Sequence, residues 1–166
     1  MTNTKKTAYC AMLTALSLIF GYIEALLPFS VGIPGIKLGL ANLVVVIGLY
    51  FMPAGCVFTV LILKVTLSSF LFGNLSMLIY SMAGGILSFF VMLALKKAKG
   101  FSMPGVSMAG GAAHNMGQLA VASLAVESTA VLYYLPVLIA AGAVTGAVIG
   151  AVAYRVRRLL WKMDID

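Results

Sequence analysis

The sequence predicts an all-α integral membrane protein that crosses the bilayer as six helices, with the N and C termini both cytoplasmic. Hydrophobic residues make up 63% of its 166 residues and charged residues only 9%, which leaves too little polar surface to cover a soluble domain. Apolar runs of about 20 residues recur along the chain, the length that spans a hydrocarbon core of ~30 Å. The lysines and arginines lie in short clusters beside these runs, as in cytoplasmic loops.

The breaks between the runs set the expected helix ends. Pro53 and Pro136 suit first-turn positions, where a missing N–H costs nothing, whereas Pro28 and the pair Gly73 and Asn74 stop helices. The second run is short. We expect a single transmembrane domain over 1–166, with helices at approximately 8–27, 38–51, 53–72, 75–95, 107–126 and 135–154.

The distribution of charge predicts the orientation. With the amino terminus inside, the basic clusters at 5–6, 96–99 and 155–162 all face the cytoplasm, and only Lys37 lies near the outer boundary. Six crossings satisfy the positive-inside rule and five do not. We therefore expect a multi-pass protein of the bacterial cytoplasmic membrane. The net charge of +7 does not indicate nucleic-acid binding, because no basic stripe is interleaved with stacking aromatic residues.

The first apolar run and the two cysteines each have a second interpretation. Lys5 and Lys6 precede the first run as in a signal peptide, but its length favours a retained helix. Cys10 and Cys56 belong to no CxxC pair and fall in apolar segments. We interpret them as small packing residues, with a disulfide or a zinc site as the weaker interpretation.

Polar side chains inside hydrocarbon are costly, so the few present here are candidate binding residues. At ~1.5 Å per residue, Glu24 is expected near the outer surface and Lys64 near mid-membrane, with Lys37 and Asn42 toward the outer end of the second helix. These groups predict a pocket that opens outward and holds an anionic or carbonyl-rich ligand. For Lys64, the alternative is snorkelling or a pair with Glu24. The connector at 28–37 is either a lid over this pocket or a plain turn.

Three polar residues of the fifth helix complete the predicted pocket. His114, Asn115 and Gln118 share one face by their i, i+4 and i, i+3 spacing. Hydrogen bonds between helices are the alternative role, and three polar groups on one face favour ligand contact. The predicted substrate-binding residues are thus Lys37, Asn42, Lys64, His114, Asn115 and Gln118.

Two ladders of small residues predict close helix contacts. Ala11 and Ala15 are four residues apart on the first helix, and Gly142, Gly146 and Gly150 repeat the same spacing on the sixth. We expect the alanines to form a docking surface and the glycines to pack inside the bundle.

Enzyme signatures are missing from the sequence. It has no GxxxxGK[ST] phosphate loop, no HExxH and no paired carboxylates, because Asp164 and Asp166 belong to the tail. One histidine and four acidic residues offer few candidates for acid–base catalysis. We expect no catalytic residue, no metal ligand and no enzymatic activity.

Two longer motifs, PGIKLGLAN at 34–42 and HNMGQ at 114–118, resemble the Gx transporter family, often labelled heptaprenyl diphosphate synthase component I. The resemblance spans nearly the whole chain. That family in turn resembles the S components of energy-coupling factor (ECF) transporters, which are six-helix receptors for vitamins and micronutrients. The segment AMLTA at 11–15 matches their AxxxA docking motif on the first helix.

The resemblance implies an ECF S-component-like bundle that binds a small micronutrient-like molecule for ATP-driven uptake. Its partners would be a transmembrane coupling subunit and two ATPase subunits; these use the ATP, and the chain itself binds no cofactor. The alternative is a noncatalytic membrane subunit in prenyl diphosphate or quinone metabolism, because chain elongation needs Asp-rich motifs that hold Mg²⁺ and none exists here. Flavin-like or isoprenoid phosphate ligands would suit the cationic pocket.

Overall fold

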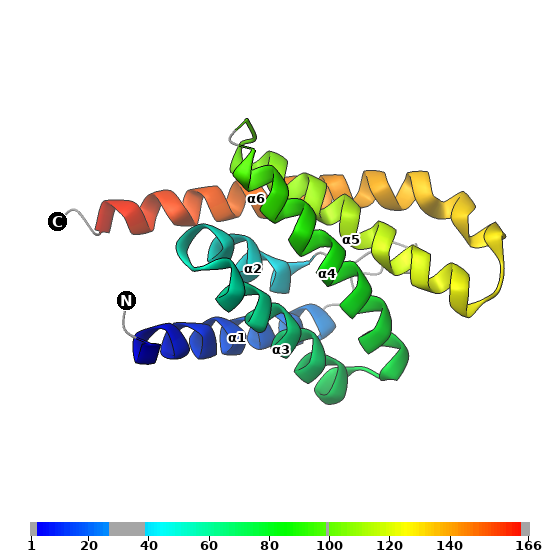
Figure 1. The fold of residues 1–166 in the computed structure, drawn as a ribbon, viewed down its shortest axis with the longest axis horizontal. Helices are drawn as coiled ribbons and strands as arrows, with labels where there is room; N and C mark the ends of the chain where they lie inside the picture. Colours follow the sequence, from blue (N-terminus) through cyan, green and yellow to red (C-terminus); the bar gives the residue numbers. More distant parts are fainter. Residues whose placement is uncertain (1–2, 27–38, 99, 164–166) are drawn as a thin grey trace.

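The computed structural model describes residues 3–26, 39–98 and 100–163, with only the backbone described for 161–163. Within these ranges the chain is all-helical, as predicted (Figure 1). The elements are α1 (Asn3–Leu26), α2 (Leu40–Phe51), α3 (Ala54–Phe72), α4 (Leu75–Lys97), α5 (Met103–Ala125), the 3₁₀ helix η1 (Thr129–Tyr134) and α6 (Leu135–Met163).

Local capping chemistry explains where several helices begin. The Asn74 side chain accepts a hydrogen bond from the backbone N–H of Met77 at 2.8 Å and caps α4. Ser102 caps α5 in the same way through Gly105, with Pro104 in the first turn. This cap starts α5 before the predicted residue 107. At the other end of the chain, α6 continues past the predicted end at 154, because no glycine or proline follows to stop it.

Four helical segments are long and apolar enough to cross a membrane: α1, α3, α4 and the stretch Thr129–Leu160. The short helix α2 is apolar, and α5 is long but carries more polar residues and glycines. The chain is thus a membrane-embedded helical protein. The start of α1 and the end of α6 lie at the same end of the molecule (Figure 1). The count of six crossings and the cytoplasmic location of both ends stay predictions.

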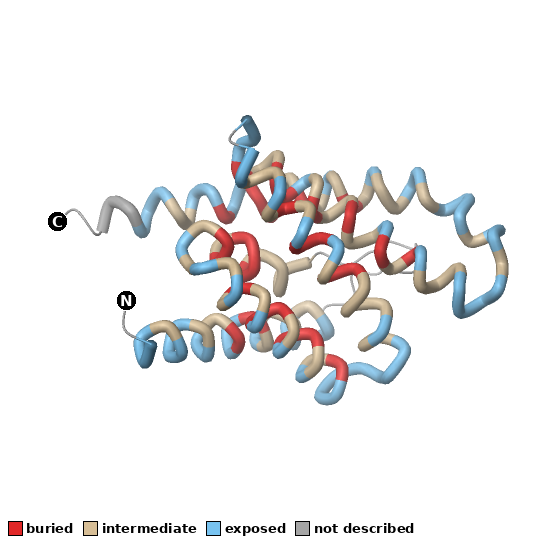
Figure 2. Tube along the Cα trace, in the orientation of Figure 1, coloured by how far each residue is buried: buried red, intermediate tan, exposed pale blue. Residues whose placement is uncertain are grey.

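The helices form two groups that meet around α2. In the first group α5 packs between α4 and α6, and in the second α1 packs against α2 and α3. Contacts of α2 with α6 and of α3 with α4 join the groups. Burial is greatest where they meet, and the tips of the helices are exposed (Figure 2). The core there includes Val45, Leu49, Val57, Phe89 and Val106.

Glycines bring the backbones of α5 and α6 into direct contact. A methyl group at Gly142 would lie 2.5 Å from the carbonyl oxygen of Gly111, and one at Gly146 would meet the carbonyl oxygen of Ser107. Gly150 faces the Cα of Pro104, which would lie 2.6 Å from its added methyl. The glycine ladder of α6 therefore packs inside the bundle, as predicted. Such contacts are typical of membrane helices, where small residues permit close packing.

We predict that Gly111→Ala destabilises the protein by about 1–3 kcal/mol, because the added methyl would clash with backbone atoms that cannot rotate away. The matched control is Gly55→Ala in the first turn of α3, where an added methyl meets no atom within 4 Å. That control should be neutral or slightly stabilising. Thermal unfolding in detergent measures both. Equal midpoints for the two variants would contradict the backbone contact.

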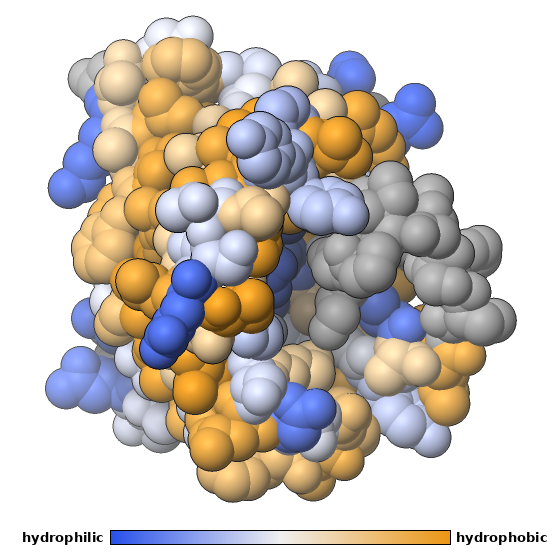
Figure 3. All heavy atoms as spheres, turned by 90° about the vertical axis from the view of Figure 1, so that its right-hand side faces the viewer, coloured by the Kyte–Doolittle hydropathy of each residue, from blue (hydrophilic) through white to orange (hydrophobic). Residues whose placement is uncertain are grey.

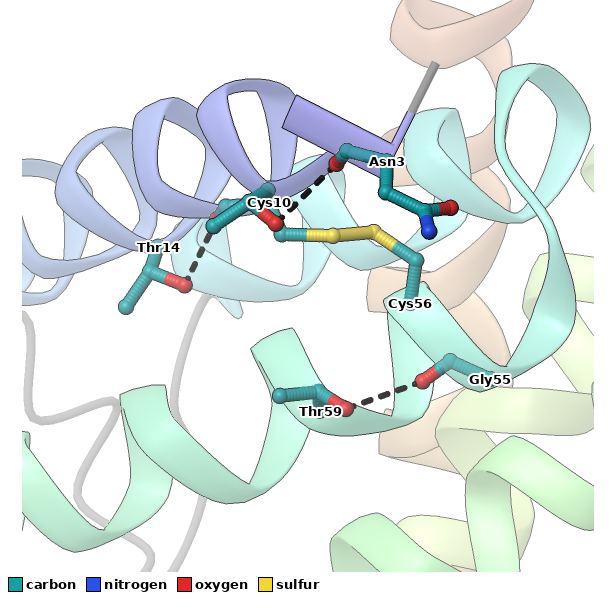
Figure 4. Close-up of a disulfide and its surroundings, with 7 residues drawn as sticks. Asn3, Cys10, Thr14, Gly55, Cys56 and Thr59 are labelled. Atoms are coloured by element: carbon teal, nitrogen blue, oxygen red, sulfur yellow. Dashed lines mark hydrogen bonds between the residues drawn. A yellow bond between two sulfur atoms is a disulfide. The ribbon is translucent and has the colours of Figure 1, made fainter. Parts of the chain in front are cut away.

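The two cysteines are not independent packing residues, so the preferred interpretation from the sequence was wrong. Cys10 of α1 and Cys56 of α3 form a disulfide across a sequence separation of 46 residues, with their Cα atoms 6.1 Å apart (Figure 4). Each cysteine lies near the start of its helix. Because α1 and α3 begin at the same end of the bundle, two positions that are remote in sequence become neighbours in space.

We predict that breaking this disulfide lowers stability by about 2–4 kcal/mol, since it closes a long loop of the unfolded chain. The thermal midpoint of the wild-type protein should fall on addition of a reductant. The variants Cys10→Ser and Cys56→Ser should each reproduce that fall and should not respond to reductant, because both lack the same bond. A wild-type midpoint that is insensitive to reductant would contradict this expectation.

Candidate binding site

A cluster of polar groups from three helices lies where α1 ends and α2 begins. The side-chain oxygen Oε1 of Glu24 on α1 accepts a hydrogen bond from the backbone N–H of Gly39 at 2.6 Å. The Nζ of Lys64 on α3 donates to Oδ1 of Asn42 on α2 at 2.5 Å. Gly39 has a φ of 74°, a left-handed conformation that favours glycine. These four residues tie the ends of the connector and the middle of α3 together.

Lys64 is the most constrained member of this cluster. Only 7% of its surface is exposed, so its ammonium does not snorkel to an interface. Its hydrogen-bond partner is Asn42, and the Glu24 carboxylate, which bonds to Gly39, is near enough to interact with it electrostatically. A buried cation in an apolar bundle is costly, and such residues usually mark a binding site or a transport pathway.

The three polar residues of α5 contact two different neighbours. A methyl group at Gly84 of α4 would lie 2.9 Å from Cγ of Gln118 and 3.2 Å from Cε1 of His114, so these two side chains lie against α4. Asn115 instead donates from Nδ2 to the carbonyl oxygen of Leu138 on α6 at 2.7 Å. The three residues therefore do not face one neighbour: His114 and Gln118 contact α4, and Asn115 contacts α6. Asn115 therefore has a structural hydrogen bond in addition to its predicted contact with substrate.

Gln118 has no hydrogen-bond partner among the residues that the structure describes. Its amide can both donate and accept, so it remains available to a ligand. Lys37 and the connector 28–37, both predicted to contribute to the site, lie outside the described residues.

Figure 3 views the molecule from the end where α5 meets η1. Some hydrophilic atoms are recessed there among apolar ones. No group of three histidine, cysteine or acidic residues in the described ranges could hold a metal ion.

Sequence reasoning missed the contribution of Gly39. Its backbone N–H binds Glu24, so a residue without polar side-chain atoms joins α1 to α2. The signal was a glycine directly before an apolar helix, in the segment KLGLAN, because glycine at a helix start suits a left-handed conformation. Glu24 itself was placed near the pocket but was not counted among the binding residues.

The fold and site together define a helical membrane protein with a buried polar cluster. The comparisons with known proteins then assign a family. The sequence model of the family described as heptaprenyl diphosphate synthase component I matches residues 13–156. The chain belongs to this family. No curated protein and no solved structure matches the chain. The family assignment confirms the resemblance seen in the two long motifs.

We predict that Asn42→Leu destabilises the protein by about 1–3 kcal/mol, because it removes the acceptor of a buried ammonium. The double variant Asn42→Leu with Lys64→Met should be less destabilised than Asn42→Leu alone, since an apolar pair leaves no buried charge without a partner. Thermal unfolding of the wild type, both single variants and the double variant gives the coupling energy. Strictly additive effects would mean that the two side chains do not interact.

Proposed function

We propose that this chain is the membrane-embedded, substrate-binding S component of an ECF-type uptake transporter. The hydrogen bond of the buried Lys64 to Asn42 is the observation that carries the proposal. A buried charged residue within an apolar bundle rarely stabilises the fold, because removing a charge from water is costly. Such a residue is therefore better explained by a role in binding a ligand. The ligand class that suits a buried ammonium with neighbouring amides is a small anionic or carbonyl-rich molecule.

In this proposal each polar group has a role in binding. Lys64 supplies the positive charge, while Asn42 orients its ammonium. Gln118 offers an unused amide, and Asn115 and His114 lie on the same turn of α5. The Glu24–Gly39 hydrogen bond anchors the connector where it enters α2. Substrate would enter beneath the connector, with help from Lys37.

The proposed energy source lies in the partners. A coupling subunit that spans the membrane would contact α1, and two ATPase subunits would hydrolyse ATP to drive reorientation and release. Ala11 and Ala15 are both exposed on α1, as are the neighbouring Met12 and Ile19. Exposed small residues four apart permit close approach of a second helix.

The second candidate function is a noncatalytic membrane subunit of a prenyl diphosphate synthase. The description of the matching family supports it. The described acidic residues, Glu24 in α1 and Glu127 just after α5, form no Asp-rich motif for Mg²⁺. Any chain elongation would therefore be carried out by a soluble partner, with this chain holding the apolar intermediate.

The partners that copurify with the tagged, full-length protein from its native membrane distinguish these functions. A coupling subunit with two ATPases supports transport, whereas a soluble Asp-rich synthase supports the second candidate. Recovery of the synthase alone would overturn the transport proposal.

We predict that Ala11→Leu and Ala15→Leu each reduce recovery of the coupling subunit at least about tenfold, because a bulky side chain prevents close helix contact. Ala151→Leu, at an exposed position of α6, is the matched control and should leave recovery unchanged. Thermal midpoints near the wild-type value would verify that all three variants fold. Unchanged recovery in both α1 variants would remove the docking role.

A further inference from the structure

A second site of distinct chemistry lies at the end of the bundle where α1 begins and α6 ends, which we call the basic end. A cavity of about 480 Å³ opens there. It is lined by residues of three helices: Tyr50 at the end of α2, residues 101–104 at and just before the start of α5, and Tyr154 and Arg157 of α6. None of these residues belongs to the polar cluster of Glu24, Gly39, Asn42 and Lys64.

Two cations from different helices converge on Tyr50 at this cavity. The guanidinium of Arg157 lies 5.1 Å from the centre of the Tyr50 ring, and Nζ of Lys96 lies 5.2 Å from it. Both distances are within the range of cation–π contacts. Lys96 also donates to the carbonyl oxygen of Leu49 at 2.5 Å and so is bound to the end of α2. The ring therefore holds the two positive charges close together.

Arg157 has donors to spare. In the described part of the chain its partner is the Tyr50 ring, and no hydrogen bond or ion pair engages the guanidinium. A guanidinium carries five N–H donors in a planar fork that fits the oxygens of a phosphate. Of the acidic residues in the described ranges, Glu24 lies in the last turn of α1 and Glu127 just after the end of α5. Both of these helix ends are far from the basic end (Figure 1). The cations at the basic end thus have no carboxylate of those ranges beside them.

The remaining walls of the cavity are apolar and partly exposed. Phe101 is 54% exposed and Tyr154 is 50% exposed, and Met103 and Pro104 also line the cavity. Aromatic residues of this kind concentrate at the level of lipid headgroups. The cavity therefore presents a phosphate-binding cation next to surfaces that suit glycerol and the first methylenes of an acyl chain.

We propose that this cavity binds the phosphate headgroup of an anionic membrane lipid. Arg157 contacts the phosphate, Lys96 adds a second positive charge, and Phe101 and Tyr154 pack against the lipid's apolar part. Basic pockets between membrane helices recognise such headgroups. The proposal rests on the membrane setting and on this geometry, and it does not depend on the transport function.

The test titrates the purified full-length protein in a neutral detergent with short-chain phosphatidylglycerol and follows thermal stabilisation. Arg157→Gln should weaken the apparent affinity about 10- to 150-fold, because it removes a charge-assisted contact. The matched control is Arg158→Gln, the next residue of the same helix, whose side chain is exposed and outside the cavity lining. It should lose only the general attraction to an anionic surface, about fivefold.

A second matched pair makes the test independent of any folding defect in Arg157→Gln. Lys96→Gln should weaken binding more than Lys97→Gln, since Lys96 is half-buried beside Tyr50 and Lys97 is exposed. Native mass spectrometry of the wild type then reports how many lipids stay bound, with one expected.

Two further ligands identify the source of the phosphate. Glycerol phosphate carries the phosphate without acyl chains, and phosphatidylcholine carries acyl chains with no net charge. Tight binding of phosphatidylglycerol alone assigns the site to the lipid. Equal affinity for glycerol phosphate keeps the phosphate site and assigns it to a soluble ligand. Equal affinity for phosphatidylcholine, or equal weakening by Arg157→Gln and Arg158→Gln, would overturn the proposal.

Discussion

The close contact of α5 with both of its neighbours is the constraint on which the rest of the structure depends. In lipid, apolar side chains gain little by packing against each other, so helices associate where small residues bring their backbones together. Gly111 and Gly142 meet on the α6 side, and Gly117 faces Ala83 on the α4 side, where an added methyl would lie 2.8 Å from a carbonyl oxygen. Because α5 is enclosed in this way, it can carry polar residues that an exposed membrane helix could not.

The molecule has two ends of different chemistry. Toward one end, the buried Lys64 bonds to the partly buried Asn42, and the partly buried Glu24 bonds to Gly39. At the basic end, Lys96 and Arg157 both contact the ring of Tyr50, and Tyr50 and Arg157 line an open cavity. The first arrangement suits a ligand that leaves water entirely, and the second suits a ligand that stays at the interface. The core of α2, with Val45, lies between them.

The sequence predicted the helices well because apolar periodicity and helix-stopping residues are local properties. Asn74 and the segment around Pro53 mark helix boundaries in the structure as they do in the sequence. What depends on helix rotation was less accessible: Asn115 faces α6 while Gln118 faces α4, although both lie on one predicted face. The Lys64–Asn42 bond was also hidden, since depth along the membrane was predicted but not which side chains meet. The disulfide was missed for the same reason, because spacing in sequence says nothing of which helix starts lie side by side.

The disulfide between Cys10 and Cys56 has a mechanical consequence. It joins α1, about two turns from its start, to the first turn of α3. Cys10 is one residue before Ala11 along α1. The disulfide therefore fixes the distance between α1 and α3 at one end, whereas no covalent bond fixes it at the other end. Lys64 lies farther along α3 and Glu24 at the free end of α1. A displacement of α1 near Cys10 therefore moves α3 as well. If the angle between the two helices widens, they separate at the end that holds the polar cluster.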